Sequence, residues 1–219
     1  FTEYQKLLIS KIYDGAIRAY NNLAPAQIAW GAESEPRYTF NRRWQLNPNT
    51  HEKYLRNPFG GVDKVRMNPG GVSSDDFIKS GPVDDKVSFL TIQSITGKPI
   101  SLLANYSTHY APTRAKIPTI SADYYGMFAN KIKHLAEANL TEPPFVGIMS
   151  NGTSGDLTPI NWENRKKYGP FEMTETVANG LAETVKKAHE KVTFQDNIKL
   201  DARQREITLK IRKPDEELV

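Results

Sequence analysis

The order of the elements predicted for the middle of the chain constrains its fold more than any other feature. Residues 86–95 and 99–107 are rich in apolar and β-branched side chains, and the turn at 96–98, which carries a glycine, predicts a β-hairpin. A helix over 121–138, with Ser121 as its N-cap, and a strand over 145–150 follow. Because a strand–helix–strand crossover sets its two strands parallel, the sequence predicts an α/β fold with helices packed on a mixed β-sheet or sandwich.

Four further segments with clear periodicity flank this unit. Residues 27–32 predict a strand, and residues 174–191 predict a helix capped by Thr174. Residues 205–211 (REITLKI) alternate and predict a half-exposed strand. Residues 3–21 predict an amphipathic helix. The apolar stripe of that helix comprises Tyr4, Leu7, Leu8, Ile12, Ala16, Ile17 and Tyr20.

Residues 44–81 show neither a helical nor a strand period. Asn, Pro, Gly and Asp dominate this stretch. A loop of this length inside a compact domain is usually functional or disordered, so we expect either the rim of an active site or a tolerated surface insertion. The stretch is too short to form a domain of its own, and we expect residues 1–219 to form a single domain.

Composition excludes several kinds of site. The chain has no cysteine, so a metal ion would need His, carboxylate, Tyr or water ligands. No apolar run approaches the roughly 20 residues of a membrane span. The net charge is +4 with the basic residues spread out, which indicates a solvated face; contact with an anionic membrane surface is the alternative, and no nucleic-acid partner is expected. Because Phe1 is not an initiator Met, we expect a piece of a longer protein, whose location the lack of a signal peptide leaves open.

The segment 145–162 (FVGIMSNGTSGDLTPINW) is the strongest candidate for a functional loop. It begins as a buried strand and ends in glycines and small polar residues. Gly152 and Gly155 permit a sharp turn that presents backbone N–H groups, and Asp156 and Thr158 add a carboxylate and a hydroxyl. A plain glycine-rich surface turn is the alternative interpretation.

The four histidines divide into two groups. His51, His134 and His189 lie among polar or charged neighbours, and we expect them on the surface. His109 instead follows the strand 99–107 in the sequence NYSTHY. It is either a structural residue or one ligand of a metal site, since zinc needs at least three protein ligands.

Four segments in order resemble the neutral/alkaline (non-lysosomal) ceramidase family. YTFNRR is similar to the family's Asn-Arg-Ser-Pro segment through Asn41 and Arg42, and NYSTH places His109 at a zinc-ligand histidine. SADYYGMF and FVGIMSNGTSGDLTP resemble two further family segments. The resemblance spans nearly the whole chain but only the middle of the family's catalytic domain.

The resemblance implies a zinc-dependent amide hydrolase that cleaves N-acylsphingosine to sphingosine and fatty acid. Thr158 falls on the family's nucleophilic serine, and Asp156 shares its loop. Arg42 would hold a polar head group, with Gly152 and Gly155 as oxyanion donors. His109 would be the single zinc ligand of this chain, with the remaining ligands outside it. The strand–helix–strand order separately predicts that His109 faces the same cleft as the 152–158 turn, because it brings the carboxyl ends of strands 99–107 and 145–150 to one side of the sheet.

The resemblance also sets the expected partners. A sphingolipid or another N-acyl amide would be the substrate, with possible contact to a membrane surface, and the location would be extracellular or periplasmic. The isolated piece would be inactive because one imidazole cannot hold zinc alone. The alternative function is a non-catalytic ceramidase-like domain that binds a lipid or glycan, which threonine in place of the family's serine at Thr158 favours.

Overall fold

The computed structural model describes residues 1–49, 57, 59–70, 75–211, 213, 214 and 216. Its helices are α1 (Glu3–Asn21), α2 (Asp123–Leu135), α3 (Glu172–His189) and the 3-10 helix η1 (Pro36–Tyr38). Its strands are β1 (Ala26–Ser34), β2 (Phe40–Asn41), β3 (Arg43–Leu46), β4 (Val65–Met67), β5 (Phe77–Ser80), β6 (Lys86–Ser94), β7 (Pro99–Tyr106), β8 (Val146–Asn151) and β9 (Leu157–Thr158).

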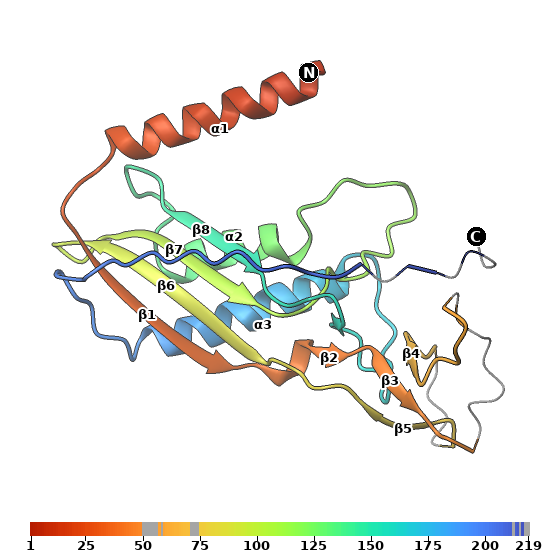
Figure 1. Ribbon diagram of the computed structural model, residues 1–219. Helices are drawn as coiled ribbons and strands as arrows, with labels where there is room; N and C mark the ends of the chain where they lie inside the picture. The colour runs from red at the N-terminus through yellow and green to blue at the C-terminus, as the bar shows by residue number, and fades with distance from the viewer. Residues whose placement is uncertain (50–56, 58, 71–74, 212, 215, 217–219) are drawn as a thin grey trace.

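A four-stranded mixed sheet forms the centre of the molecule (Figure 1). Its strand order is β1-β6-β7-β8, with β1, β6 and β7 antiparallel and β8 parallel to β7. The hairpin predicted at residues 96–98 joins β6 to β7, and α2 connects β7 to β8 as the predicted crossover. The predicted α/β class, with helices on a mixed sheet, is therefore confirmed.

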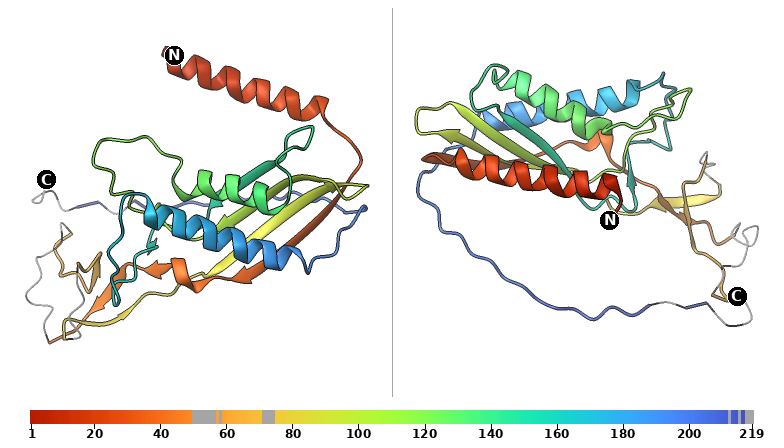
Figure 2. Two further views of the ribbon diagram at one scale, coloured as in Figure 1. Left: turned by 180° about the vertical axis from the view of Figure 1, so that it is seen from behind. Right: turned by 90° about the horizontal axis from the view of Figure 1, so that it is seen from above.

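Helices α2 and α3 pack side by side on one face of this sheet (Figure 2, left). The apolar sides of both helices meet the inward-facing residues of β6, β7 and β8, as the period of each element requires. Gly147 lets α2 approach β8 closely, since a Cβ there would lie 2.8 Å from the Ala129 carbonyl oxygen. The largest fully buried apolar side chains are Tyr106, Tyr124, Phe128, Ile132, Leu181, Val87, Val177 and Val185.

The other face of the sheet is open and partly apolar. Trp30, Leu90, Leu103 and Ile148 lie directly opposite one another across the four strands. The exposed fractions of Trp30, Leu103 and Ile148 are 54%, 42% and 45%. Among the described residues, no helix covers this face, and the segment after α3 passes beyond it at a distance (Figure 2, right).

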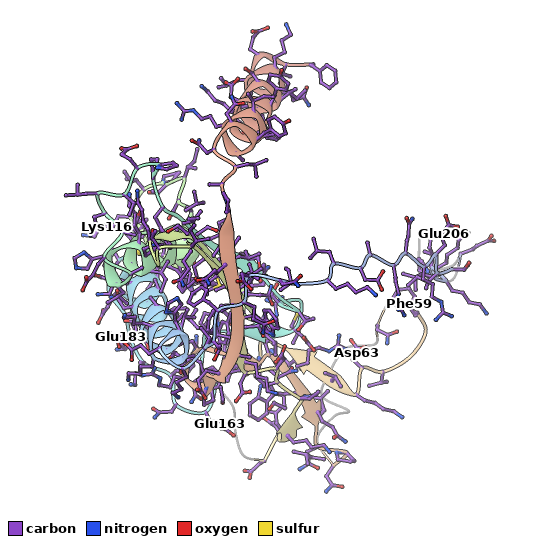
Figure 3. The ribbon with its side chains drawn as sticks, turned by 90° about the vertical axis from the view of Figure 1, so that its left-hand side faces the viewer. Phe59, Asp63, Lys116, Glu163, Glu183 and Glu206 are labelled. Atoms are coloured by element: carbon purple, nitrogen blue, oxygen red, sulfur yellow. The ribbon has the colours of Figure 1, made fainter. Side chains whose placement is uncertain are left out.

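Helix α1 has the predicted bounds, but its apolar stripe is not buried. None of its residues is buried, and it projects from the body (Figures 1 and 3). The predicted strand 205–211 is wrong, because these residues are exposed coil, and Glu206 lies clear of the central sheet (Figure 3). An apolar period predicts a local conformation, whereas burial needs a second surface, which the described residues do not supply to either segment.

The predicted loop 44–81 contains strands instead. Strands β4, β3 and β5 form a small antiparallel sheet in that order, and β2 pairs with β9 in another. Trp44, Leu46, Phe77 and Trp162 make a second, smaller core beside the small three-stranded sheet. Part of the predicted loop is therefore an ordered small sheet that follows β2 in the chain. Residues 50–56, 58 and 71–74 lie outside the described residues.

Both predicted caps need correction. Helix α2 begins at Asp123, so its N-cap is Ala122 rather than Ser121; the Ser121 hydroxyl, one position earlier, accepts from the Asp123 N–H at 3.0 Å. Helix α3 begins at Glu172 after Phe171, whose φ is 59°. Thr174 therefore lies inside the helix, and its hydroxyl is fully buried without a partner among the described residues.

Candidate functional site

The carboxyl ends of β7 and β8 lie at one edge of the central sheet. Their parallel register places Asn105 opposite Ser150 and Tyr106 opposite Asn151. The turn that carries His109 and the glycine-rich turn therefore leave the sheet side by side. In α/β proteins, ligands bind at the carboxyl ends of parallel strands, so this edge is the first place to look for a site.

The glycine-rich turn is bonded tightly to the end of β7. The N–H of Gly152 donates to the Tyr106 carbonyl oxygen at 2.9 Å, and the N–H of Thr153 donates to Ser107 Oγ at 3.2 Å. Ser107 Oγ in turn donates to Asp84 Oδ2 at 3.2 Å. A Cβ at Gly152 would lie 2.5 Å from Ser107 Oγ, so only glycine permits this approach. The predicted sharp turn is present.

Strand β2 forms a second wall of the site by pairing with β9. Phe40 lies opposite Thr158, and Asn41 lies opposite Leu157. Asn41 is 2% exposed, and its amide nitrogen donates to the Pro82 carbonyl oxygen at 2.7 Å and to Asp156 Oδ2 at 3.3 Å. This buried amide thus fixes the Asp156 carboxylate relative to β2.

Arg42 holds the same loop from outside. Its N–H donates to the Asp156 carbonyl oxygen at 2.8 Å, and its guanidinium donates to the Gly155 carbonyl oxygen through Nη2 at 2.7 Å and Nε at 3.3 Å. A guanidinium carries five N–H donors, so these bonds do not exhaust its capacity for a ligand. The structure brings Arg42, Gly155 and Asp156 together.

His109 is half-buried in the turn after β7. Burial is the main cause that lowers its pKa, and the positive charge of Arg42 lowers it further. The backbone carbonyl of Tyr110 and the Asp123 carboxylate oppose this effect. Since Arg42 acts on the imidazole and also bonds to Gly155, His109 and the loop share one electrostatic environment. That His109 faces the same cleft as Thr158 stays a prediction.

Thr158 lies in β9 and is only 5% exposed. Its hydroxyl accepts from the Ile160 N–H at 3.4 Å, which is a long contact. The hydroxyl is therefore oriented weakly and shielded from solvent. For it to attack a substrate, that substrate would have to enter beside β2 and β9.

Hydrogen bonds within the turn limit which N–H groups can bind an oxyanion, the role expected of Gly152 and Gly155. The N–H of Gly152 is occupied by Tyr106, and the N–H groups of Thr153 and Ser154 are bonded to Ser107 and Gly152. Within the described part of the chain, the N–H groups of Gly155 and Asp156 have no hydrogen-bond partner. These two are the donors available to a developing negative charge.

The described residues contain no group of three His, Asp or Glu side chains that could hold a metal ion. His109 fits the role of a single ligand, because its ring is only half-buried and lies in the turn at the carboxyl end of β7. His134 is exposed as predicted, and His51 lies outside the described residues.

The expected surface position of His189 is wrong. Its ring is half-buried between Phe89 and Phe194, and its Nε2 lies 3.3 Å from Thr91 Oγ1. Burial lowers its pKa. It lines a small cavity of about 130 Å³ near the β6–β7 hairpin, far along the sheet from His109.

Sequence reasoning missed the residues that support the site loop through hydrogen bonds and packing rather than through chemistry of their own. Asn41 was noted only as part of the Asn41-Arg42 pair, and Asp84 was not noted at all. Gly81 offered a signal, because a Cβ there would lie 2.6 Å from the Asn41 amide nitrogen. Because Gly81 lies far from Asn41 in the sequence, it becomes informative only when the fold is known.

Comparison with solved structures gives the same fold. The structure titled "Ceramidase complexed with C2" matches with a TM-score of 0.54 and 16% identity over 80% of this chain. The neutral ceramidase from Pseudomonas aeruginosa matches with a TM-score of 0.50 and 17% identity over 80%. The chain spans 24% of the length of each. The resemblance to neutral ceramidases is therefore confirmed as a likeness of fold.

Two other comparisons add no relative. No protein-family model matches the chain, and no curated protein matches it. Among the described residues, no helix has the length and apolar character needed to cross a membrane.

Proposed function

We propose that the protein containing this chain hydrolyses N-acyl amides, with N-acylsphingosine as the expected substrate. The likeness of fold to neutral ceramidases supports the chemical class. The observation that carries the proposal is the loop at Gly155 and Asp156, which hydrogen bonds from Arg42 and Asn41 hold, with Arg42 also acting on the pKa of His109. Hydrolysis of an amide needs a nucleophile, a donor for the developing oxyanion and a group that transfers protons, and this loop supplies residue types for each role.

The chain's own residues would divide this work. The N–H groups of Gly155 and Asp156 would bond to the oxyanion, and the Thr158 hydroxyl would attack or position the nucleophile. The Asp156 carboxylate would accept a proton, because Asn41 fixes one of its oxygens and leaves the group half-buried. Arg42 would bind the polar head group of the substrate.

Zinc is part of the proposal, with His109 as the ligand that this chain contributes. When bound, zinc polarises a carbonyl oxygen. Because the described residues supply one candidate ligand, the others would come from outside them. Location outside the cytoplasm and contact with a membrane surface stay predictions.

A second function is favoured by one observation. Thr158 is 5% exposed, and its branched side chain is more constrained than the serine it replaces. A hydroxyl so shielded suits a ceramidase-like domain that binds a lipid or glycan without cleaving it. The two functions predict opposite results for the same variants.

The deciding experiment measures fatty-acid release from N-acylsphingosine by the full-length protein, together with its zinc content. Thr158→Ala should lower kcat by roughly 100-fold or more while zinc content stays unchanged, because the hydroxyl acts in the transition state. Thr158→Ser should keep or raise activity. Thr96→Ala, in the β6–β7 hairpin, is the matched control and should leave kcat unchanged.

Two results would change the proposal. A loss of only a few-fold in Thr158→Ala, with a larger loss in Asp156→Asn, would assign the attack to water rather than to threonine. A wild-type protein that binds zinc but releases no fatty acid from N-acylsphingosine or simple N-acyl amides would establish the binding function instead.

A further inference from the structure

We propose that Asp123 and Tyr124, the first two residues of α2, act as a clamp that positions the turn carrying His109. The inference rests on the proposed function in one respect, which is that His109 is a metal ligand. Neither clamp residue is assigned contact with metal or substrate. Both are positioning residues that act through the backbone on either side of the imidazole.

The hydrogen bonds of the clamp fall on both sides of His109. On the far side, Asp123 Oδ1 accepts from the Ala111 N–H at 3.0 Å and from the Tyr124 N–H at 2.7 Å. On the near side, the Tyr124 hydroxyl donates to the Thr108 carbonyl oxygen at 3.2 Å. The start of one helix thus fixes the backbone immediately before and two residues after the imidazole.

The backbone groups in these bonds are buried, so losing a partner would be costly. Thr108, Ala111 and Tyr124 are each 0% exposed, whereas the side chain of His109 reaches solvent. A buried carbonyl or N–H that loses its partner destabilises the folded protein, because water cannot replace the bond. The turn therefore has few alternative conformations, and the imidazole extends from a backbone that is held from within the core.

The backbone conformation of Asp123 fits the same role. Its φ is 53°, in the left-handed region that most residues avoid. Asp and Asn tolerate this region better than other residues with a Cβ because their side chains bond to nearby backbone groups. Here the side chain bonds to the next N–H of the helix and to Ala111, so the unusual φ and the clamp are one feature.

The consequence for function is geometric. A ligand residue that shares a metal with side chains from elsewhere must be held within about 0.5 Å of its working position, and partners behind the ligand supply that precision. Asp123 and Tyr124 meet this requirement for His109 because they fix the backbone on both sides of it.

The test compares Asp123→Ala, Asp123→Asn and Tyr124→Phe in the full-length protein. Zinc affinity is measured by competition with a chelator, and hydrogen exchange is followed in a peptide that covers 108–112. Asp123→Ala should weaken zinc binding about 10- to 100-fold and speed exchange at Ala111. Asp123→Asn keeps the acceptor oxygen and the tolerated φ, so it should stay within a few-fold of wild type. Tyr124→Phe should fall between them.

Several outcomes would overturn the clamp. Unchanged zinc affinity in Asp123→Ala, or equal losses in the Asn and Ala variants, would show that the acceptor oxygen does not position His109. If Asp123→Ala does not fold, Tyr124→Phe decides, because it keeps the buried ring and removes only the hydroxyl; wild-type affinity in that variant would refute the clamp.

His109→Ala separates this inference from the proposed function. If that variant retains full zinc affinity, the proposed metal role fails. The clamp is then judged on exchange alone: it stands if Ala111 is protected in wild type and Asp123→Asn but not in Asp123→Ala, and it falls if the three proteins exchange alike.

Discussion

The two ends of the central sheet each hold a half-buried histidine, and the pKa of each is lowered chiefly by burial. His109 lies at the carboxyl ends of β7 and β8. His189 lies near the β6–β7 hairpin, where it lines a small cavity between that turn and the helices. By pKa alone the two would be equal candidates for a functional role.

Their neighbours separate them. The ring of His189 lies among two phenylalanines, with centroid distances of 6.3 Å to Phe89 and 5.8 Å to Phe194. The ring of His109 also lies on an aromatic ring, with a centroid distance of 4.1 Å to Tyr110, but its turn is held on both sides by hydrogen bonds from α2. A pKa lowered by burial therefore indicates packing, and only the convergence of fixed polar groups indicates a site.

The largest expected effect is a difference between the two histidines in how their substitution changes zinc content and activity. In the full-length protein, His109→Ala should abolish stoichiometric zinc and reduce amidase activity by more than about 100-fold, because a direct ligand matters more than the groups behind it. His189→Gln should keep both within a few-fold. Metal analysis and steady-state kinetics on both variants check this. Equal losses in the two would mean that both histidines act through stability.

A smaller effect tests how tightly the carboxyl edge is built. Gly152→Ala should destabilise the protein by about 1–3 kcal/mol, because the added methyl meets Ser107 Oγ at 2.5 Å. Gly155→Ala is the matched control, since a Cβ there has no atom within 4 Å, and it should change stability by less than about 0.5 kcal/mol. Denaturant unfolding measures both, and a neutral Gly152→Ala would mean that the turn moves freely.

The smallest expected effect is the contribution of His189, near the β6–β7 hairpin, to the pH dependence of the protein's stability. The pKa of His189 is lower in the folded protein than its usual value of 6.5, so the unfolded chain takes up this proton first as pH falls. The stability that the neutral ring contributes is present above about pH 6.5 and is lost as pH drops through the folded pKa. Melting temperature should therefore decrease less between pH 7.5 and 5.5 in His189→Gln. Identical slopes in variant and wild type would exclude His189 as the cause.

Sequence reasoning predicted the parts of the fold that depend on local pattern. The hairpin at 96–98, the crossover through α2 and the bounds of α1 are all present. The grouping of Arg42 with Gly155 and Asp156 followed from a resemblance, because no period or spacing connects segments so far apart in the chain. Their hydrogen bonds now give that grouping a physical basis.

The wrong predictions share one cause: a sequence pattern does not show which other segment an element will pack against. Thr174 satisfies the chemistry of a cap, yet the helix begins two residues earlier and buries it. The alternation of 205–211 is that of a strand, yet the described residues offer it no neighbour. The three short strands in 44–81 have too few residues for a period to be detected and depend on contacts with one another.

The pairing of β2 with β9 has a consequence for the order in which this chain acquires structure. Arg42 and Gly155 bond across 113 positions of sequence, whereas β6 and β7 are joined by a tight turn. Closing so long a loop costs chain entropy that only later contacts repay, so the hairpin should form early and the β2–β9 wall late. During synthesis, the bonds of Asn41 and Arg42 to residues 155 and 156 cannot form until that loop has left the ribosome. By the same reasoning, the bonds that hold the candidate site should form after the β6–β7 hairpin, and the contacts of the α3 region with the β1 region, which span up to 158 positions, later still.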